Sequence, residues 1–370
     1  MSSQNQDKKK FKILALDGGG IRGVVTAKIL EELQNQLKVA GIEQPLNQYF
    51  DLIVGTSTGS IVAAGLVLNK TPEELINIYR DRGKEIFRST WLRIPILSTK
   101  YSNEGLIQVL KEELGEDITL RQVGEMPGAE LLILAYDTLY RNTTFFASRY
   151  FQNHNDKWFN DKRLWEICLS SASAPTFFPP YEFKCKDEGG EWRFPHIDGG
   201  IGANCPSLAA LRYAIKEKKQ SIQDISIISI GTGRTTRPLE YEKIKNWNIL
   251  NWGQNIPDVF MGGQIQIITD SCEEIVNTAN PKGYLRLQFN ITEPFEKRGS
   301  EIKPVKIINQ NEQINKFTKE HINHAMDDVS QKNIKKLLDA ASLYSKSKSS
   351  DIKEFIASHK ESKDLQPMAF

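Results

Sequence analysis

The chain has 370 residues, of which 39% are hydrophobic and 25% are charged, and its formal net charge is +2 at pH 7. This is ordinary globular composition, which excludes a disordered chain, and the small net charge argues against nucleic-acid binding as the main function. No apolar run reaches transmembrane length, and residues 1–10 lack the apolar core of a signal peptide, so we expect a cytoplasmic location.

The first predicted strand and helix enclose a glycine-rich turn. Residues 11–16 form an apolar run typical of a buried strand, and residues 17–23 follow with the sequence DGGGIRG. Residues 24–40 then carry an apolar stripe at helical spacing, which Gly41 ends. The turn leaves bare backbone N–H groups, which is what an oxyanion hole requires.

A second strand, turn and helix follow about one βαβ unit later. Residues 49–54 predict a short buried strand, and residues 61–68 predict a buried helix. Between them, residues 55–59 have the sequence GTSTG, the Gly-x-Ser-x-Gly form of a nucleophile elbow. Together the two turns indicate a serine acyl hydrolase.

The rest of the pattern alternates between helices and strands. A capping box at residues 71–74 predicts a helix that continues to residue 86. Further helices are expected at residues 105–114 and 163–174, and further strands at residues 131–136, 142–147 and 225–230. Such alternation predicts a mostly parallel sheet with helices on both faces.

The glycine-rich turn also permits another interpretation. Gly18, Gly20 and Gly23 satisfy the pattern G-x-G-x-x-G after a strand and at the start of a helix, which is typical of nucleotide-binding loops. A phosphotransferase or dehydrogenase using residues 18–23 is therefore an alternative function. Neither activity gives a role to Ser57.

A serine nucleophile needs a group that takes its proton, and residues 195–200, PHIDGG, offer two. His196 and Asp198 both have suitable side chains, and histidine is the commoner general base. Chemistry alone does not choose between them. The four cysteines and five histidines show no metal-ligand spacing, so no metal and no cofactor is expected.

Taken as a set, the motifs resemble those of the patatin-like phospholipases, a family of lipid acyl hydrolases. They are residues 17–23, 55–59, 171–175 (SASAP), 198–200 (DGG) and 229–233 (SIGTG), in the family's order. The likeness spans residues 11–287, roughly three quarters of the chain. One departure is Ser60, where the family commonly has glycine, and we expect it to disturb packing slightly and the chemistry not at all.

The resemblance implies a three-layer α/β/α fold with a mostly parallel central sheet and a helical C-terminal region. We therefore expect a disordered polar tail at residues 1–10 and a patatin-like acyl hydrolase domain at residues 11–300. From about residue 301 the composition shifts to Lys, Gln, Asn and Ser. For residues 301–370 we expect a helical, partly mobile extension that lies largely on the surface.

The resemblance also assigns roles to residues. It implies a Ser57–Asp198 dyad and gives His196 no place in a triad. The N–H groups of Gly18, Gly19 and Gly20 are expected to form the oxyanion hole, and Arg22 to steady that loop or to contact a lipid phosphate. The expected supporting residues of the motifs are Asp17, Arg22, Gly23, Gly55, Gly59, Gly199 and Gly200.

The expected reaction is the release of fatty acid from membrane glycerolipids at a bilayer surface. Residues 87–101 mix aromatic, aliphatic and cationic side chains and are predicted to make peripheral membrane contact, with residues 145–159 and 247–261 as further candidates. A non-catalytic lipid-binding scaffold is the third alternative. Activation by a protein or a small messenger is left open by the sequence, as is the choice between phospholipid and galactolipid.

Overall fold

The structure is a computed structural model that describes residues 10–88, 98–150, 157–187, 190–234, 239, 241–291, 295–298, 301–304 and 322–361. Its strands are β1 (Phe11–Leu16), β2 (Leu52–Thr56), β3 (Glu130–Asp137), β4 (Asn142–Ala147), β5 (Tyr181–Asp187), β6 (Gly190–Asp198), β7 (Ile225–Ile230), β8 (Tyr284–Leu287), β9 (Phe295–Arg298) and β10 (Glu301–Pro304).

Its α-helices are α1 (Gly23–Val39), α2 (Leu46–Tyr49), α3 (Thr58–Val67), α4 (Pro72–Ile86), α5 (Glu104–Leu114), α6 (Leu120–Glu125), α7 (Leu164–Ala172), α8 (Gly200–Ala203), α9 (Ser207–Lys216), α10 (Tyr241–Ile244), α11 (Ile249–Ala279), α13 (Gln331–Ser347) and α14 (Ser349–His359). Two short 3₁₀ turns, η1 (Gly20–Arg22) and η3 (Ile222–Asp224), complete the described elements.

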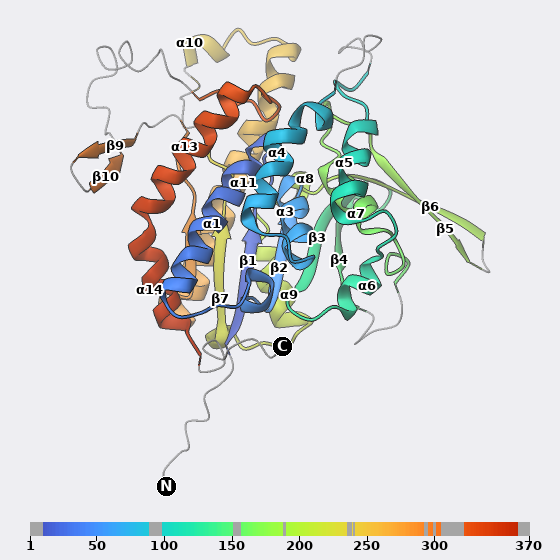
Figure 1. The fold of residues 1–370 in the computed structure, drawn as a ribbon. Helices are drawn as coiled ribbons and strands as arrows, with labels where there is room; N and C mark the ends of the chain where they lie inside the picture. Colours follow the sequence, from blue (N-terminus) through green and yellow to red (C-terminus); the bar gives the residue numbers. More distant parts are fainter. Residues whose placement is uncertain are drawn as a thin grey trace.

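The central sheet has the strand order β5-β6-β3-β2-β1-β7-β8, with β4 also paired to β3. Strands β3, β2, β1, β7 and β8 run parallel, whereas β4, β5 and β6 join antiparallel to their neighbours at the β3 edge. Figure 1 shows β1 near the middle of this sheet. The carboxyl ends of β1 and β2 therefore lie side by side, and both glycine turns follow those ends.

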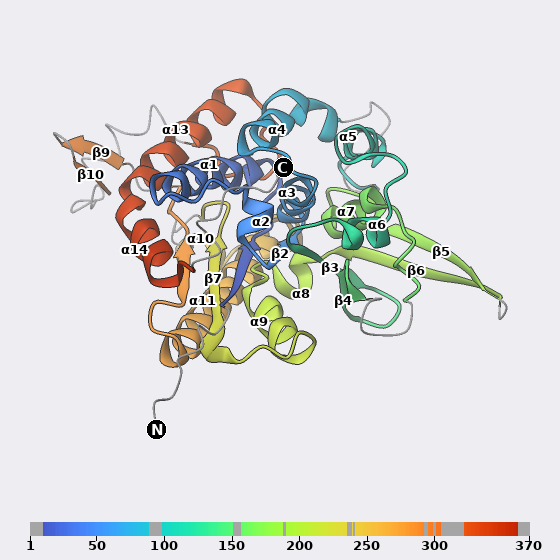
Figure 2. The same cartoon turned by 60° about the horizontal axis from the view of Figure 1, so that its bottom comes forward.

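Helices cover both faces of the sheet, because alternate residues of its buried strands point to opposite sides. In β1, Leu14 and Leu16 contribute to one apolar core, and Ile13 and Ala15 to the other. The first core packs against α1, α3 and α4, and the second against α9 and α11 (Figure 2). The predicted α/β/α architecture with a mostly parallel sheet is confirmed.

Most predicted elements are present within a residue or two of their expected bounds. The Thr71 capping box forms as predicted: the Thr71 hydroxyl accepts from the Glu74 N–H, and Pro72 opens α4. One difference is at residues 49–51, which were predicted as strand. Residues 46–49 instead form the one-turn helix α2, with Pro45 at its N-cap position, and β2 begins at Leu52.

The C-terminal helices are part of the main body. Helix α13 lies along α1 (Figure 1), and the apolar side chains of α13 and α14 are buried in the same core as α1. Residues 331–359 are thus helical and pack on the core through one face, while most of their other residues are exposed or half-buried. The assignment of residues 301–370 to a separate, partly mobile extension stays a prediction, as does a domain boundary near residue 300.

Candidate active site

Ser57 stands on the turn between β2 and α3. Its backbone has φ 54° and ψ −126°, a conformation that residues with a Cβ rarely adopt. The turn is so tight that a Cβ on Gly59 would overlap the Leu16 carbonyl oxygen of β1. The expected elbow geometry is therefore present: a strained serine at the N-terminus of a fully buried helix.

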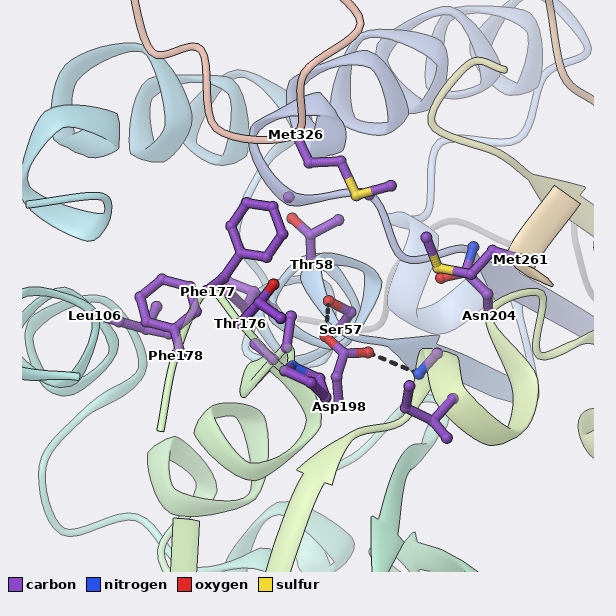
Figure 3. A pocket seen from close by; sticks show the side chains of 18 of the residues that line it. Ser57, Thr58, Leu106, Thr176, Phe177, Phe178, Asp198, Asn204, Met261 and Met326 are labelled. Carbon is purple, nitrogen blue, oxygen red and sulfur yellow. Dashed lines mark hydrogen bonds between the residues drawn. The ribbon is translucent and has the colours of Figure 1, made fainter. Parts of the chain in front are cut away.

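Asp198 is the last residue of β6, and that strand brings it to Ser57. Pairing of β6 with β3 sets Asp198 opposite Ala135. The Ser57 hydroxyl donates to Asp198 Oδ2 at 2.6 Å, and the Gly200 N–H donates to Asp198 Oδ1 at 2.7 Å (Figure 3). Both carboxylate oxygens are thus engaged, and the side chain is held toward the serine.

Burial changes the acid–base chemistry of this carboxyl group. Asp198 is 6% exposed, and its removal from water raises its pKa to about 6, although the hydrogen bonds from Ser57 and Gly200 act in the opposite direction. A carboxylate with a raised pKa is a better proton acceptor than an exposed aspartate. Asp198 therefore has both the position and the basicity to take the Ser57 proton.

The glycine loop after β1 lies beside this pair. The Gly18 N–H donates to the Asn204 carbonyl at 3.1 Å, so this amide is already engaged. Gly19 and Gly20 line the cavity that holds Ser57 and Asp198, and in the described part of the chain no acceptor is found for their N–H groups. The Thr58 N–H, at the first turn of α3, also has no acceptor within its own helix.

Two buried charged side chains of the first motif, Asp17 and Arg22, support the glycine loop. The Asp17 carboxylate, 1% exposed, pairs with the Arg286 guanidinium of β8, which also donates to the Ser229 hydroxyl at 2.6 Å. Arg22 is also buried, and its guanidinium donates to the Gly19 carbonyl at 3.4 Å. Arg22 is not among the residues that line the cavity, so these contacts favour a loop-supporting role over a phosphate contact.

The remaining motif glycines are places where other groups approach closely. A Cβ on Gly23 would overlap Tyr79, and one on Gly55 would overlap the Gly59 carbonyl. A Cβ on Gly199 would overlap the Leu134 carbonyl, and one on Gly200 would crowd the Asp198 carboxylate. The motifs thus keep glycine because the catalytic turns pack directly against their neighbours.

A cavity of about 610 Å³ opens in front of Ser57. Most of its lining is apolar, and Figure 3 shows aromatic side chains on one side and Met326 and Met261 on the other. The principal apolar residues are Ile61, Ile86, Phe87, Leu106, Phe177, Phe178, Phe260, Met261 and Met326. No Lys, Arg or His is among the described residues that line it, so the cavity suits an acyl chain better than a phosphate.

His196 belongs to a different environment. It is fully buried among the rings of Phe146, Trp158 and Phe183. Its Nε2 is 2.9 Å from the Thr144 hydroxyl, and its Nδ1 is 3.0 Å from a backbone carbonyl of β6. Burial lowers its pKa, and both ring nitrogens have partners, so it has the contacts of a structural histidine.

The segments expected to contact a membrane are only partly described. Residues 89–97 and 151–156 lie outside the described residues. Of their neighbours, Phe87, Tyr101 and Phe178 form an aromatic cluster, and Phe146 and Phe159 are core residues. Among the described residues of the three segments, Phe260 in the third is the exposed apolar side chain that lines the cavity, and it is 70% exposed.

Several contributing residues were not identified from the sequence. Asn204 accepts from the Gly18 N–H through its carbonyl, and Met326 forms one wall of the cavity (Figure 3). The Met326 carbonyl also accepts from the Ile21 N–H at 2.8 Å. Asn204 follows the DGG motif closely enough to be suspected, whereas neither Arg286 nor Met326 carries any local signal.

Two further properties concern only the described residues. They contain no helix that is long and apolar enough to cross a membrane. They also contain no group of three or more His, Cys, Asp or Glu side chains that could hold a metal ion. All four cysteines are free thiols.

Comparison with known proteins identifies relatives. The family model "Patatin-like phospholipase" matches residues 14–211, which include Ser57 and Asp198. "Patatin-like protein 2" of Oryza sativa subsp. indica is 29% identical over 327 residues, covering 78% of this chain and 79% of the relative. "Probable inactive patatin-3-Kuras 1" of Solanum tuberosum is 30% identical over 263 residues, covering 65% of this chain and 68% of the relative.

Among solved structures, "Human GIVD cytosolic phospholipase A2" aligns with a TM-score of 0.53. The alignment covers 97% of this chain and 61% of that one, at 10% sequence identity. At this identity the likeness supports the fold alone.

Proposed function

The chain belongs to the patatin-like phospholipase family and is a lipid acyl hydrolase, and from this premise we propose that Ser57 is its nucleophile and Asp198 its general base. The family indicated by the motifs is confirmed, and so is a serine ester hydrolase as the class of enzyme. The observation that carries the dyad is the 2.6 Å hydrogen bond from Ser57 Oγ to a buried carboxylate inside an apolar cavity.

The reaction then has two halves. Ser57 Oγ attacks the ester carbonyl carbon while Asp198 Oδ2 accepts its proton, and the tetrahedral intermediate collapses as Asp198 returns that proton to the leaving alcohol. Water, deprotonated by Asp198, next attacks the acyl-serine. Collapse of the second intermediate releases the fatty acid and restores the Ser57 hydroxyl.

The oxyanion of both intermediates needs preorganised donors. We assign this role to the N–H groups of Gly19 and Gly20, with Thr58 N–H at the start of α3, because these three residues line the cavity beside Ser57. Losing one such donor typically costs about 2.7–4 kcal/mol of transition-state stabilisation. Gly19→Val, whose side chain would collide with Thr232, should therefore lower kcat by about 10²–10³ without a comparable change in KM. An unchanged kcat would remove this loop from the mechanism.

The substrate is proposed to be a membrane glycerolipid whose acyl chain occupies the cavity. Support comes from the apolar lining and from the absence of a cation among the described lining residues, which leaves the head group outside. Phe260, 70% exposed, and Ile201, 50% exposed, both line the cavity and extend into solvent. We propose that peripheral membrane contact is made by these two residues, which we call the cavity rim. Lys100, one of the two described cations of the segment 87–101, forms an ion pair with Asp327.

The nucleotide-binding alternative is not favoured. It gives no role to the Ser57–Asp198 hydrogen bond, and no Lys, Arg or His that could pair with a phosphate is among the described residues that line the cavity. A cytoplasmic location stays a prediction, as do an activator protein or messenger.

The proposal is tested by fatty-acid release from vesicles that contain both phospholipid and galactolipid. The parent should release fatty acid, and Ser57→Ala and Asp198→Ala should each abolish the release. The lipid class that is consumed identifies the head group. Release that persists in either variant contradicts the dyad. If a folded parent hydrolyses neither the vesicles nor a short soluble ester, the proposed activity fails and a lipid-binding scaffold takes its place.

A further inference from the structure

Ser57 has an unfavourable backbone conformation at the nucleophile elbow. A residue with a side chain is strained at positive φ, and it keeps this conformation only where its surroundings fix it. Ser57 has φ 54°. Its peptide groups must therefore be held by specific partners, and those partners decide where its hydroxyl points.

Two buried serine side chains hold the two peptide groups of Ser57. The Ser57 N–H donates to Ser171 Oγ at 2.9 Å, and the Ser171 hydroxyl in turn donates to the Leu134 carbonyl at 2.6 Å. On the other side, the Ser60 hydroxyl donates to the Ser57 carbonyl at 2.6 Å. Ser60 and Ser171 are both fully buried. Ser171 comes from α7, so it ties the elbow to a separate element.

The same end of α7 also holds the other catalytic residue. The Asp198 N–H donates to the Ser173 carbonyl at 3.0 Å, and the Gly199 N–H donates to the Ser171 carbonyl at 3.1 Å. Ser171 thus contacts the elbow through its side chain and the Asp198 turn through its backbone. A change of its side chain disturbs the elbow while the backbone bonds to the Asp198 turn can remain.

We propose that Ser171 and Ser60 are positioning residues that clamp the nucleophile elbow and hold Ser57 Oγ against Asp198. This inference rests on the proposed function of Ser57 and Asp198. Neither Ser171 nor Ser60 lines the cavity, so both act through Ser57 and not on the substrate. The Ser57 N–H, being bonded to Ser171, is also not an oxyanion donor. From the sequence, Ser60 was expected not to affect the chemistry. In this proposal it does, because its hydroxyl bonds to the Ser57 carbonyl and helps to orient the nucleophile.

The SASAP motif supplies a matched control for this role. Ser173 is as deeply buried as Ser171, but its hydroxyl donates only to the Leu169 carbonyl one helical turn before it. Ser171→Ala and Ser173→Ala each remove one buried hydroxyl of the same size. Only Ser171→Ala removes a group that touches the elbow.

The experiment measures how fast a long-chain fluorophosphonate labels Ser57, together with kcat and KM on a soluble ester. Ser171→Ala should slow labelling and kcat by about ten- to a hundredfold with little change in KM, because small displacements of a reacting group carry costs of this size. Ser173→Ala should stay within about threefold of the parent, and Ser171→Thr, which restores a hydroxyl, should recover much of the rate. Ser60→Ala should slow labelling less, since the Ser60 N–H also donates to the Ser57 carbonyl.

The possible results distinguish failure of the proposed nucleophile from failure of the proposed Ser171 clamp. If the parent is not labelled at Ser57, the proposed nucleophile fails. If the parent is labelled and Ser171→Ala reacts at the rate of Ser173→Ala, the dyad stands and the clamp is overturned. If Ser171→Ala is not obtained folded, Ser171→Cys replaces it with the same expectation, because a thiol is a weak hydrogen-bonding group. Labelling of that variant at the parent rate also overturns the clamp.

Discussion

Asp198→Asn should make the enzyme inactive. At neutral pH it should also remove the destabilisation that comes from burying a charged carboxylate. Burial raises the pKa of Asp198 from the ordinary 3.8 to about 6. The folded protein therefore holds this proton more tightly than the unfolded chain does. As the pH rises from about 4 to about 6, the unfolded chain ionises first, so this carboxyl group lowers stability progressively and the loss is complete above pH 6. An asparagine has no such titration.

The size of the effect follows from the shift. A change of about two pKa units corresponds to about 3 kcal/mol at 1.36 kcal/mol per unit, and about 2 kcal/mol of this falls between pH 4.5 and pH 7.5. We expect the free energy of unfolding of Asp198→Asn, relative to the parent, to rise by that amount over this interval. The absolute difference at one pH also contains the altered hydrogen bonds to Ser57 and Gly200, so the change with pH is the quantity to measure.

The assay is urea unfolding of both proteins at a series of pH values in that interval, at constant ionic strength. Ser173→Ala serves as a control, because it removes no titratable group and its difference from the parent should not vary with pH. Ser57→Ala should move in the direction opposite to Asp198→Asn, since the Ser57 hydrogen bond lowers the pKa of Asp198. A difference between Asp198→Asn and the parent that is flat from pH 4.5 to pH 7.5 would refute the reasoning.

Three further predictions concern activity, membrane contact and the support of the glycine loop. On a soluble ester, kcat/KM should fall about tenfold per pH unit below about pH 6, as Asp198 becomes protonated, and a profile that stays flat to pH 5 contradicts this. Phe260→Ser should weaken co-sedimentation with lipid vesicles while Ile275→Ser, on the same helix but outside the cavity lining, should not; equal binding by both rules out the rim. Arg286→Met leaves the buried Asp17 carboxylate unpaired and should cost about 3–5 kcal/mol of unfolding free energy, whereas the double variant with Asp17→Asn should recover part of it; urea unfolding without that recovery contradicts the pairing.

The catalytic turns were predictable because their signals are local. A strand, a glycine turn and a helix follow one another within about twenty to thirty residues at each turn, so the sequence alone places Ser57 at an elbow. The choice of Asp198 over His196 was not available from chemistry and came from the family resemblance. The structure gives the physical difference: Asp198 contacts Ser57, whereas His196 is held by Thr144 and an aromatic cluster.

What supports the turns was not predictable, because it depends on contacts between distant parts of the chain. Arg286 is 269 residues from Asp17, and Ser171 is 114 residues from Ser57. Neither side chain has a local pattern that identifies its partner. The packing of helices α13 and α14 against α1 was not predictable for a related reason: their polar composition reflects their exposed faces, while their apolar residues complete the core around α1.

The central claim is that the acyl group passes through Ser57, and one measurement tests it directly. The parent is mixed with an excess of a slowly hydrolysed ester and quenched in acid, and its peptides are analysed by mass spectrometry for the added acyl mass. The account predicts the acyl group on the peptide containing Ser57 and no acylation in the Ser57→Ala variant. Acylation of another residue, or hydrolysis that continues in Ser57→Ala, would contradict it.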